Sequence, residues 1–596
     1  MRSLSIQNVA FLGRISNLVI RFASLYESFQ ALTSIQVSHF VEWFSGSGIS
    51  AIWTQTNISG TGTFAMADEI DGGYSIISDA LGGNRSEIDF NNKRHYTHDS
   101  SEIIMVAKRV SAGSLRCGFW SNIAGTNTDF AHYTDHSGDT FKSLYTGDAS
   151  TGSITTSDVA VNTSWTGVKI ECGASNIKLY LDGVLKVTKT TNRPTVKMQP
   201  IAFSQYVSTN SEIRIRYLEA YNTSVTLLST LAERFSLLTQ VFKQRVVEYF
   251  SGSALDSARW TFTDISGTGS SGIADEIDGG AFVKSGTSAF DRSSINFNTK
   301  RQYDYANCII IGVVKRVDAS NLLHFGLGDT ADISGAVSDD KANYVEDSDG
   351  SFKALATADG VTASSTNTDV AVNTSWTGVK IECGASNIKL YLDGVLKVTK
   401  TTNRPANKLQ PVFLSRSQTG GAKENRIRYC EAYNKLTTET SYPSFYELFK
   451  ALTTVMKQRF QDWFDGNDID TTRWTTTNHN APTNTMIDGI DEGYELKCNA
   501  TNNSDTKLHF NQKRQYDPAS SVMISVWKQH TVGSPALLAV GFMNSNTQLS
   551  MATSTDSAFV RVFVDSNANF NLFTADATTE SGTSSAVAVD QSFHVH

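Results

Sequence analysis

The chain has 596 residues, of which 40% are hydrophobic and 18% charged, and its formal net charge is −8 at pH 7. This length corresponds to roughly three or four domains, and this composition is typical of globular domains and excludes a disordered or fibrous chain. The negative charge gives no general attraction to a phosphate backbone, so we expect no nucleic acid partner.

Six cysteines are too few and too irregularly placed to form a disulfide framework, so we expect buried thiols. No apolar run is long enough to span a membrane as a helix. The first 26 residues are apolar, but Arg14 and Arg21 interrupt them and no small-residue cleavage site follows. They therefore do not form a secretory signal peptide. Export is signalled elsewhere, or Met1 is not the true start, or the protein is assembled inside a cell, as virion proteins are.

Residues 1–38 are predicted to form a helical segment, because Ile15, Leu18, Phe22 and Leu25 recur every three or four residues. The same spacing predicts helical linkers over 223–246 and 435–459. Each helix either packs on the neighbouring domain or joins several chains in a short coiled coil, which would make the protein a homo-oligomer.

The segment 39–222 has the signals of β-strands. In Val168–Cys172 apolar and charged residues alternate, and the alternation resumes through Ile177–Leu181. Asp182 and Gly183 then form a hairpin turn, and Ile213, Ile215 and Tyr217 alternate with arginines in a closing strand. Many short strands with regular turns predict an antiparallel β-sandwich.

The same unit is repeated along the chain. The string Asp158–Pro194 returns without a change as Asp369–Pro405, and Phe90–Tyr96 returns in modified form as Phe297–Tyr303 and Phe510–Tyr516. We therefore predict an all-β protein of three tandem sandwiches, over 39–222, 247–434 and 460–596. The third copy ends at the equivalent of Val168, so we expect it to be incomplete and the chain to be part of a longer protein.

The order of these features resembles the concanavalin A-like lectin/glucanase superfamily, in particular its laminin-G-like jelly rolls. The resemblance rests on an early Trp53, on the strand Asp71–Tyr74 and on the hairpin Ile177–Val184, and it covers roughly 180 residues in each unit. It implies a jelly-roll fold and glycan binding, cell adhesion or, in one branch, glycan hydrolysis.

Hydrolysis by that branch would need two carboxylates on one strand in a Glu-x-Asp-x-x-Glu pattern. The nearest string, Glu69–Tyr74, has tyrosine in place of the second glutamate, and the third unit has Gly489 in place of the first. We therefore expect a protein that is not an enzyme.

Aspartates recur beside glycine turns in all three units, where they either ligate a structural calcium or cap backbone amides. The calcium candidates are Asp68, Asp71, Asp275, Asp278, Asp488 and Asp491. Two carboxylates per unit are far fewer than the six to eight oxygen ligands of calcium, which favours the capping role, and no other cofactor is expected.

Paired cations also recur, and they either bind acidic sugars or form ion pairs at strand ends. These residues are Lys93, Arg94, Lys300, Arg301, Lys513 and Arg514. Aromatic platforms for a sugar could come from Trp120, Tyr133 and Tyr145, although aromatic residues in strands are more often part of the core.

The sequence favours a multivalent carbohydrate-binding or adhesion protein that is extracellular, at a cell surface or on a virion, with glycans or glycoproteins as partners. The alternative is a structural spacer or fibre protein with decorative jelly rolls, and a glycoside hydrolase is the third hypothesis.

Overall fold

The computed structural model describes residues 39–222 and 244–435, with gaps at 123–128, 206–209, 277–278, 319, 336–338 and 348–349, and parts of 464–595. Every regular element in these parts is a β-strand, and they contain no helix. Residues 1–38, 223–243 and 436–459, for which helices are predicted, lie outside the described residues. The strand β16 (Arg245–Glu248) replaces the last two residues of the predicted linker helix 223–246.

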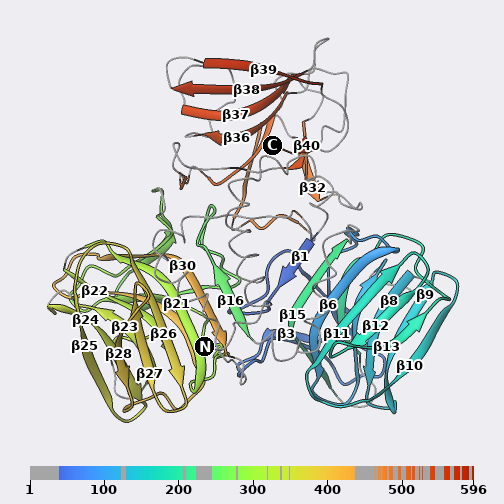
Figure 1. Cartoon of the computed structure of the whole chain (residues 1–596), viewed down its shortest axis with the longest axis horizontal. Helices are drawn as coiled ribbons and strands as arrows, with labels where there is room; N and C mark the ends of the chain where they lie inside the picture. Colours follow the sequence, from blue (N-terminus) through green and yellow to red (C-terminus); the bar gives the residue numbers. More distant parts are fainter. Residues whose placement is uncertain are drawn as a thin grey trace, which may run out of the picture. The chain divides into compact units, whose positions relative to one another are not determined.

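The first sandwich (blue to teal in Figure 1) consists of two antiparallel sheets. Its eight-stranded sheet contains β1 (His39–Glu42), β3 (Thr63–Met66), β4 (Tyr74–Ser78), β6 (Ser100–Arg109), β11 (Thr166–Gly173), β12 (Ile177–Leu181), β13 (Val184–Lys189) and β15 (Ser211–Asn222). Its seven-stranded sheet contains β2 (Thr54–Ser59), β5 (Arg85–Asp89), β7 (Ser114–Trp120), β8 (Asp129–His136), β9 (Phe141–Asp148), β10 (Gly152–Ala160) and β14 (Gln199–Gln205).

The strands follow the order β13-β12-β11-β6-β15-β4-β3 in the first of these sheets and β10-β9-β8-β7-β14-β5-β2 in the second. The last strand, β15, lies in the middle of its sheet: it pairs with β6 on one side and with β4 and then β1 on the other. The faces that the two sheets turn toward each other enclose one apolar core, which includes Trp53, Tyr74 and Phe119.

The predicted hairpin is confirmed. Strands β12 and β13 pair around Asp182 and Gly183, whose φ angles of 46° and 82° are the left-handed values that this turn requires. Along β12 the apolar residues are buried and the two between them are partly exposed, as the alternation predicts.

The closing strand departs from the predicted alternation at Tyr217. A β-bulge between Ile215 and Tyr217 inserts one extra residue into β15, which turns the following side chains to the opposite face. Ile213 and Ile215 therefore lie in the core, whereas Tyr217 packs on the outside of the sheet against Trp43, at 4.7 Å between ring centroids.

The second sandwich (green to orange in Figure 1) repeats this topology. Its eight-stranded sheet contains β16, β18 (Ser270–Ile273), β19 (Ala281–Lys284), β21 (Asn307–Arg316), β26 (Thr377–Gly384), β27 (Ile388–Leu392), β28 (Val395–Lys400) and β30 (Glu424–Asn434). Its seven-stranded sheet contains β17 (Thr261–Ser266), β20 (Arg292–Asn296), β22 (Asn321–Gly328), β23 (Asp340–Glu346), β24 (Phe352–Asp359), β25 (Ala363–Ala371) and β29 (Gln410–Ser417).

The third copy is described only in parts, so its jelly-roll fold stays a prediction. The compact unit Ser38–Gln515 includes the pairs β31 (Thr475–His479) with β34 (Asp505–His509) and β32 (Thr483–Met486) with β33 (Tyr494–Lys497). The unit that contains Tyr516–His596 includes β35 (Val526–Trp527), which pairs with β40 (His594–Val595). It also includes a sheet of β36 (Leu537–Met543), β37 (Asp556–Phe563), β38 (Asn569–Asp576) and β39 (Glu580–Ala588).

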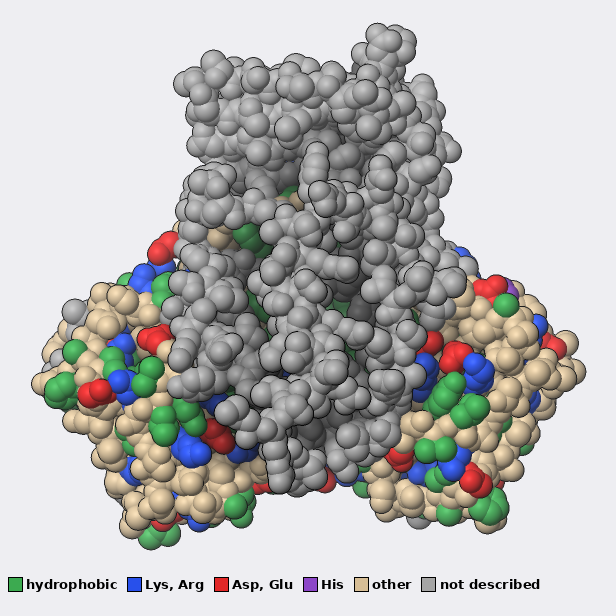
Figure 2. Space-filling view, in the orientation of Figure 1, with side chains coloured by type: hydrophobic (Ala, Val, Ile, Leu, Met, Phe, Trp, Pro, Cys, Tyr) green, Lys and Arg blue, Asp and Glu red, His purple; other side chains and the backbone are tan. Residues whose placement is uncertain are grey.

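The remaining general predictions concern cysteines, charge and membrane spans. Five of the six cysteines are buried thiols, as expected, whereas Cys498 is exposed. On the face shown in Figure 2, the Lys and Arg side chains of described residues lie interspersed with Asp and Glu. No helix within the described ranges is long and apolar enough to cross a membrane.

Candidate functional site

The first sandwich carries a cluster of aromatic and charged side chains on the face of its seven-stranded sheet that points away from the core. In a strand, successive side chains point to opposite faces, so every second residue of five neighbouring strands reaches this face. We call these residues the outer-face cluster: Arg85, Glu87, Asp89, Arg116, Trp120, Phe130, His132, Tyr145, Ile201 and Phe203.

Aromatic rings form the centre of the outer-face cluster. The indole of Trp120 and the imidazole of His132 are nearly parallel, with 5.1 Å between centroids and 5° between planes. Tyr145 packs edge-on against His132 at 5.2 Å, and Phe203 lies 5.6 Å from Trp120. The Tyr145 ring is only partly buried, whereas Trp120 is 5% exposed and His132 is fully buried.

Two guanidinium groups lie against these rings. Arg85 is 4.0 Å from the centroid of Phe203 and 4.9 Å from that of Trp120, and Arg116 is 5.6 Å from Phe203 and 6.0 Å from Tyr145. Both arginines are partly exposed. Cations over aromatic faces are attracted by the ring quadrupole, so the rings hold both groups near the surface of the sheet.

Two carboxylates, Glu87 and Asp89, project from β5 on the same face. Glu87 forms an ion pair with Arg85, but burial outweighs this attraction and raises its pKa to about 8. Burial likewise raises the pKa of Asp89 to about 6, against the hydrogen bond that Asp89 accepts from the Asn91 amide. At pH 7 Glu87 is therefore mostly protonated and Asp89 mostly ionised.

Several buried polar atoms of the cluster have no hydrogen-bond partner: both ring nitrogens of His132, Nε of Arg116 and Oδ2 of Asp89. Burial, reinforced by Arg116 and Arg85, holds the pKa of His132 well below its usual value, so the imidazole is neutral. Because buried polar groups in folded proteins are nearly always paired, these atoms mark the outer-face cluster as a place where a polar ligand or water would bind.

The second sandwich has a different surface at the same place. Pairing through β22, β23, β24 and β29 puts Gly328 at the position of Trp120, Asn343 at that of His132 and Ala356 at that of Tyr145. Ile333 packs against Val412 and Leu414 on this face. Of the two complete sandwiches, therefore, only the first carries the outer-face cluster.

The predicted aromatic platforms do not share one face. Trp120 and Tyr145 belong to the outer-face cluster, but Tyr133, the intervening residue of β8, points into the core and is fully buried. Its hydroxyl donates to Asp135 at 3.3 Å. Tyr133 therefore cannot present its ring to a ligand.

Asp68, a calcium candidate, and Arg301, a candidate for binding acidic sugars, bind each other at the contact between the first and second repeats. The carboxylate of Asp68 accepts two hydrogen bonds from the Arg301 guanidinium, at 2.6 and 3.1 Å, and lies 3.0 Å from Nζ of Lys408. Partial burial alone would raise the pKa of Asp68, but these hydrogen bonds outweigh it and hold the pKa at about 2.

The neighbouring aspartate has the same kind of role. Asp71 Oδ1 accepts hydrogen bonds from the Gln244 amide at 2.8 Å and from Asn434 Nδ2 at 2.7 Å. The Asp71 amide donates to the carbonyl of Gln302 at 3.1 Å. Asp68 and Asp71 thus join repeats, which corresponds to the capping and ion-pair interpretations and leaves few of their oxygen lone pairs for a metal.

The contact between repeats occurs twice with the same parts. The Gly46 amide donates to the side chain of Gln302, and the Gly252 amide donates to that of Gln515, at 3.3 and 3.2 Å. A Cβ added to Gly46 or to Gly252 would lie 2.7 or 2.8 Å from Cα of Arg259 or Arg473. Each repeat therefore presents a glycine loop to the next one.

A further contact links the first and third repeats, where Nζ of Lys93 donates to the carbonyl of Met486 at 2.7 Å. Among the described residues, the other predicted cations and calcium candidates do not form a common site. Lys300 and Lys513 are partly buried, Arg94 has contacts of its own, and Asp275 is exposed. Asp278, Asp488, Asp491 and Arg514 lie outside the described residues. No cluster of three or more potential metal ligands occurs in the described ranges.

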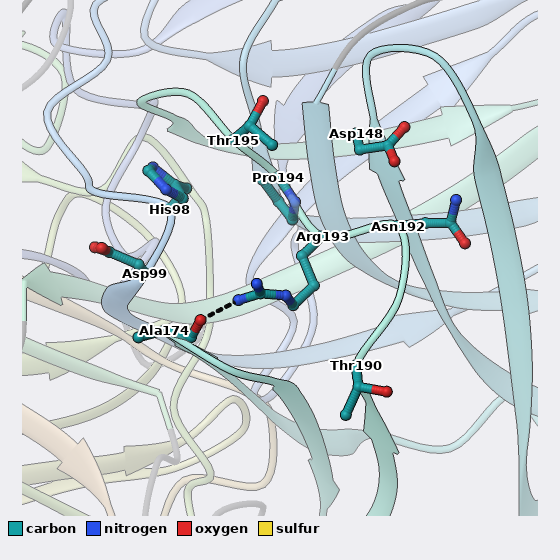
Figure 3. Close-up of a pocket in the computed structure, with 9 residues that line it drawn as sticks. All are labelled: His98, Asp99, Asp148, Ala174, Thr190, Asn192, Arg193, Pro194 and Thr195. Atoms are coloured by element: carbon teal, nitrogen blue, oxygen red, sulfur yellow. Dashed lines mark hydrogen bonds between the residues drawn. The ribbon is translucent and has the colours of Figure 1, made fainter.

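A pocket of about 350 Å³ opens at one end of the first sandwich, in the loop that follows β13 (Figure 3). Arg193 crosses it and donates to the carbonyls of Gly173, at 3.3 Å, and Ala174. Arg404 makes the same two contacts in the second sandwich. Because the guanidinium holds a loop of identical sequence in both copies, we assign it a structural role.

No family model matches the chain, and no curated protein matches it. Solved structures similar to part of it include a Bacillus licheniformis β-glucanase, at 14% identity and a TM-score of 0.24, over 31% of this chain and 98% of that one. The VIP36 exoplasmic/lumenal domain in a Ca²⁺- and Man-bound form matches at 9% identity and 0.24, over 32% and 91%.

A third similar structure is the apo form of the Crh5 transglycosylase, at 12% identity and a TM-score of 0.25, over 32% of this chain and 85% of that one. In each complete sandwich of the present chain, a seven-stranded and an eight-stranded antiparallel sheet pack around one core, with the closing strand in the middle. Each complete sandwich thus has the all-β, two-sheet antiparallel architecture that the predicted jelly-roll fold requires.

Proposed function

We propose that the chain binds carbohydrate through the outer-face cluster of the first sandwich, outside a cell or on a virion, and that it is not an enzyme. The observation that carries the proposal is the combination, on one sheet face, of the partly exposed ring of Tyr145 with the partly exposed guanidinium groups of Arg85 and Arg116. Sugar sites in proteins combine an aromatic surface, on which the apolar face of a sugar packs, with a few oriented polar groups.

The carboxylate pair on β5 is the feature that favours a glycosidase as an alternative. Retaining glycosidases use two carboxyl groups about 5–5.5 Å apart, with pKa values that differ. Glu87 and Asp89 lie two residues apart on one face and have different pKa values, but both are fully buried. Because a nucleophile and an acid must touch the sugar, their burial favours binding without hydrolysis.

A structural spacer is the second alternative, and the contacts between repeats favour it. If the domains serve only to space other parts of an assembly, the outer-face cluster has no ligand. Multivalent adhesion remains part of our proposal. The second sandwich would then bind a different ligand from the first, because the corresponding face carries Gly328 and Ala356 in place of Trp120 and Tyr145.

The test is the binding of a broad oligosaccharide panel to the full chain and to Tyr145→Ala. A matched control is Tyr180→Ala, which removes a partly buried tyrosine from the other sheet of the same sandwich. We expect Tyr145→Ala to weaken binding about five- to thirtyfold, since aromatic contacts contribute on the order of 1–2 kcal/mol, and Tyr180→Ala to leave it unchanged.

Absence of binding by the full chain to every oligosaccharide would favour the spacer. Release of reducing sugar that disappears in Glu87→Gln would establish the glycosidase instead.

A further inference from the structure

We propose that the first sandwich selects acidic glycans, whose carboxylate or sulphate group pairs with the guanidinium of Arg116. The inference rests on the proposed function and specifies its ligand class. Of the two arginines of the outer-face cluster, Arg116 is the one that has no carboxyl group in contact with it among the described residues.

The arrangement of the other charges supports this. Arg85 is paired with Glu87. In the described part of the chain no carboxylate forms an ion pair with Arg116. Its guanidinium lies over the rings of Tyr145 and Phe203, and its Nε has no hydrogen-bond partner. The nearest acidic influence comes from Asp139, an exposed residue that interacts with His136 at 3.7 Å.

Without a bound anion, the charged guanidinium of Arg116 is energetically unfavourable in this position. Burial lowers the pKa of Arg116, and the positive charge of Arg85 lowers it further, which means that its surroundings disfavour the cation. A guanidinium is nevertheless always protonated in proteins. An anion that forms two parallel N–H···O bonds with it would compensate this cost, and carboxylates and sulphates have the planar or tripodal oxygens for such a pair.

The neighbouring rings favour an anion that is part of a sugar. The centroid of the partly exposed Tyr145 ring lies 6.0 Å from the Arg116 guanidinium, so the ring and the cation are neighbours on the sheet face. A uronic acid or sulphated sugar could therefore pack on the tyrosine while its charged group reaches the arginine. A free inorganic anion would use the guanidinium but gain nothing from the ring.

The second sandwich lacks this arrangement. Strand pairing places His324 at the position of Arg116, and burial lowers the pKa of His324 to about 3, which leaves it neutral. The arginine of β29, Arg416, lies 5.2 Å from the ring of Phe290 and at the position of Gln205 in the first sandwich. Arg416 therefore provides a matched control for removal of a guanidinium from the same sheet face.

The experiment measures binding of the full chain to three probes: polyuronate oligosaccharides, the same oligosaccharides after reduction of their carboxylates to alcohols, and sulphated oligosaccharides of similar length. We expect at least one acidic probe to bind about tenfold or more tightly than the reduced one, as a charge-assisted pair predicts. The variant Arg116→Met should remove this preference, and Arg416→Met should retain it. Thermal unfolding of both variants verifies that they fold.

The outcomes separate the two proposals. Equal binding of acidic and reduced probes, or a preference that survives in Arg116→Met, would overturn the assignment of Arg116 while leaving carbohydrate binding intact. Loss of the preference in Arg416→Met would also overturn it. Failure of all three probes and of the wider panel would overturn the proposed function itself. Binding of inorganic sulphate as tightly as of the sulphated oligosaccharide would show that the site recognises an anion and not a sugar.

Discussion

The loop at Gly46 contacts the second repeat, and a substitution there tests directly whether this contact stabilises the protein. Gly46 has a φ of 118°, and a Cβ at this position would lie 2.7 Å from Cα and 2.9 Å from the carbonyl oxygen of Arg259. Both atoms belong to a backbone that cannot move like a side chain. Gly46→Ala therefore combines an unfavourable φ with a clash against the next repeat.

A matched control isolates the first of these effects. Gly83 has a φ of 86°, and a Cβ there would meet nothing within 4 Å. Gly83→Ala should lower the free energy of unfolding only by the strain of a positive φ, about 1–2 kcal/mol. Gly46→Ala should add to a similar strain the loss of the contact between the repeats.

The size of the additional cost follows from the hydrogen bonds at the loop. The clash can be relieved if the loop moves away from the second repeat, which breaks four hydrogen bonds. The Ser47 amide donates to Arg259 O at 3.1 Å and the Gly48 amide to Ala258 O at 2.5 Å, and the Gly46 amide and the Ser47 hydroxyl donate to the Gln302 side chain and to Ala258 O. At about 0.5–1.5 kcal/mol for each bond, separation costs about 2–6 kcal/mol, which is the upper limit of the clash energy.

The assay is hydrogen exchange of the full chain combined with thermal unfolding. We expect Gly46→Ala to increase deuterium uptake at Ser47 and Gly48, and to have an unfolding free energy lower than that of Gly83→Ala by at most about 2–6 kcal/mol. Equal uptake at these amides in both variants would refute the reasoning, because it would mean that the loop does not contact Arg259 in solution.

Three other predictions concern charged groups. Because burial raises the pKa of Glu87 from 4.5 to about 8, the folded state binds the proton more tightly, and the unfolding free energy should fall as pH rises through this window, by at most about 1.4 kcal/mol per pH unit. Denaturant titrations of Glu87→Gln should lack this slope between pH 6 and 8 and keep only the part below pH 6 that comes from Asp89. The pKa of Asp68 is instead held below its usual 3.8, at about 2. Asp68 should therefore stabilise the contact between repeats fully above pH 3.8, and this contribution should be lost as pH falls toward 2. In Asp68→Asn, hydrogen exchange at the Arg301 amide should be faster at all pH values. Chelation by EDTA should leave the melting temperature unchanged, because the oxygens of Asp68 and Asp71 are occupied by protein donors; a lower melting temperature that calcium restores would contradict this.

The fold was predictable wherever the signal is local. The alternation in Ile177–Leu181 and the Asp182–Gly183 turn correspond directly to β12 and its hairpin. The alternation failed at Tyr217, because a bulge depends on how β15 pairs with β6 and is not encoded in the spacing of apolar residues.

The outer-face cluster was only partly predictable. Trp120 and Tyr145 could be named as platforms, but their convergence with Arg116 and His132 depends on the order of strands in the sheet, which no local pattern reveals. The pattern Glu-x-Asp-x-x-Glu did not indicate the pair Glu87 and Asp89, because Asn92 stands where the pattern requires its second glutamate. A Glu-x-Asp string within an alternating strand was the signal that could have found it.

The roles of Asp68 and Arg301 could not have been assigned from one repeat. Each residue looks like a free surface charge within its own unit, and only the docking of two units brings them to 2.6 Å. Recurrence of both residues in every copy was equally compatible with a ligand site and with an interface.

The central position of β15 constrains how the first sandwich forms during synthesis. Until residues 211–222 leave the ribosome, β6 and β4 have no strand between them and the core of the eight-stranded sheet is open. Local hairpins such as β12–β13 can form early, but contacts between distant segments are slow to form. A ribosome that pauses before residue 211 would therefore hold an incomplete, aggregation-prone domain, and the second sandwich, which ends in β30, repeats the same vulnerability.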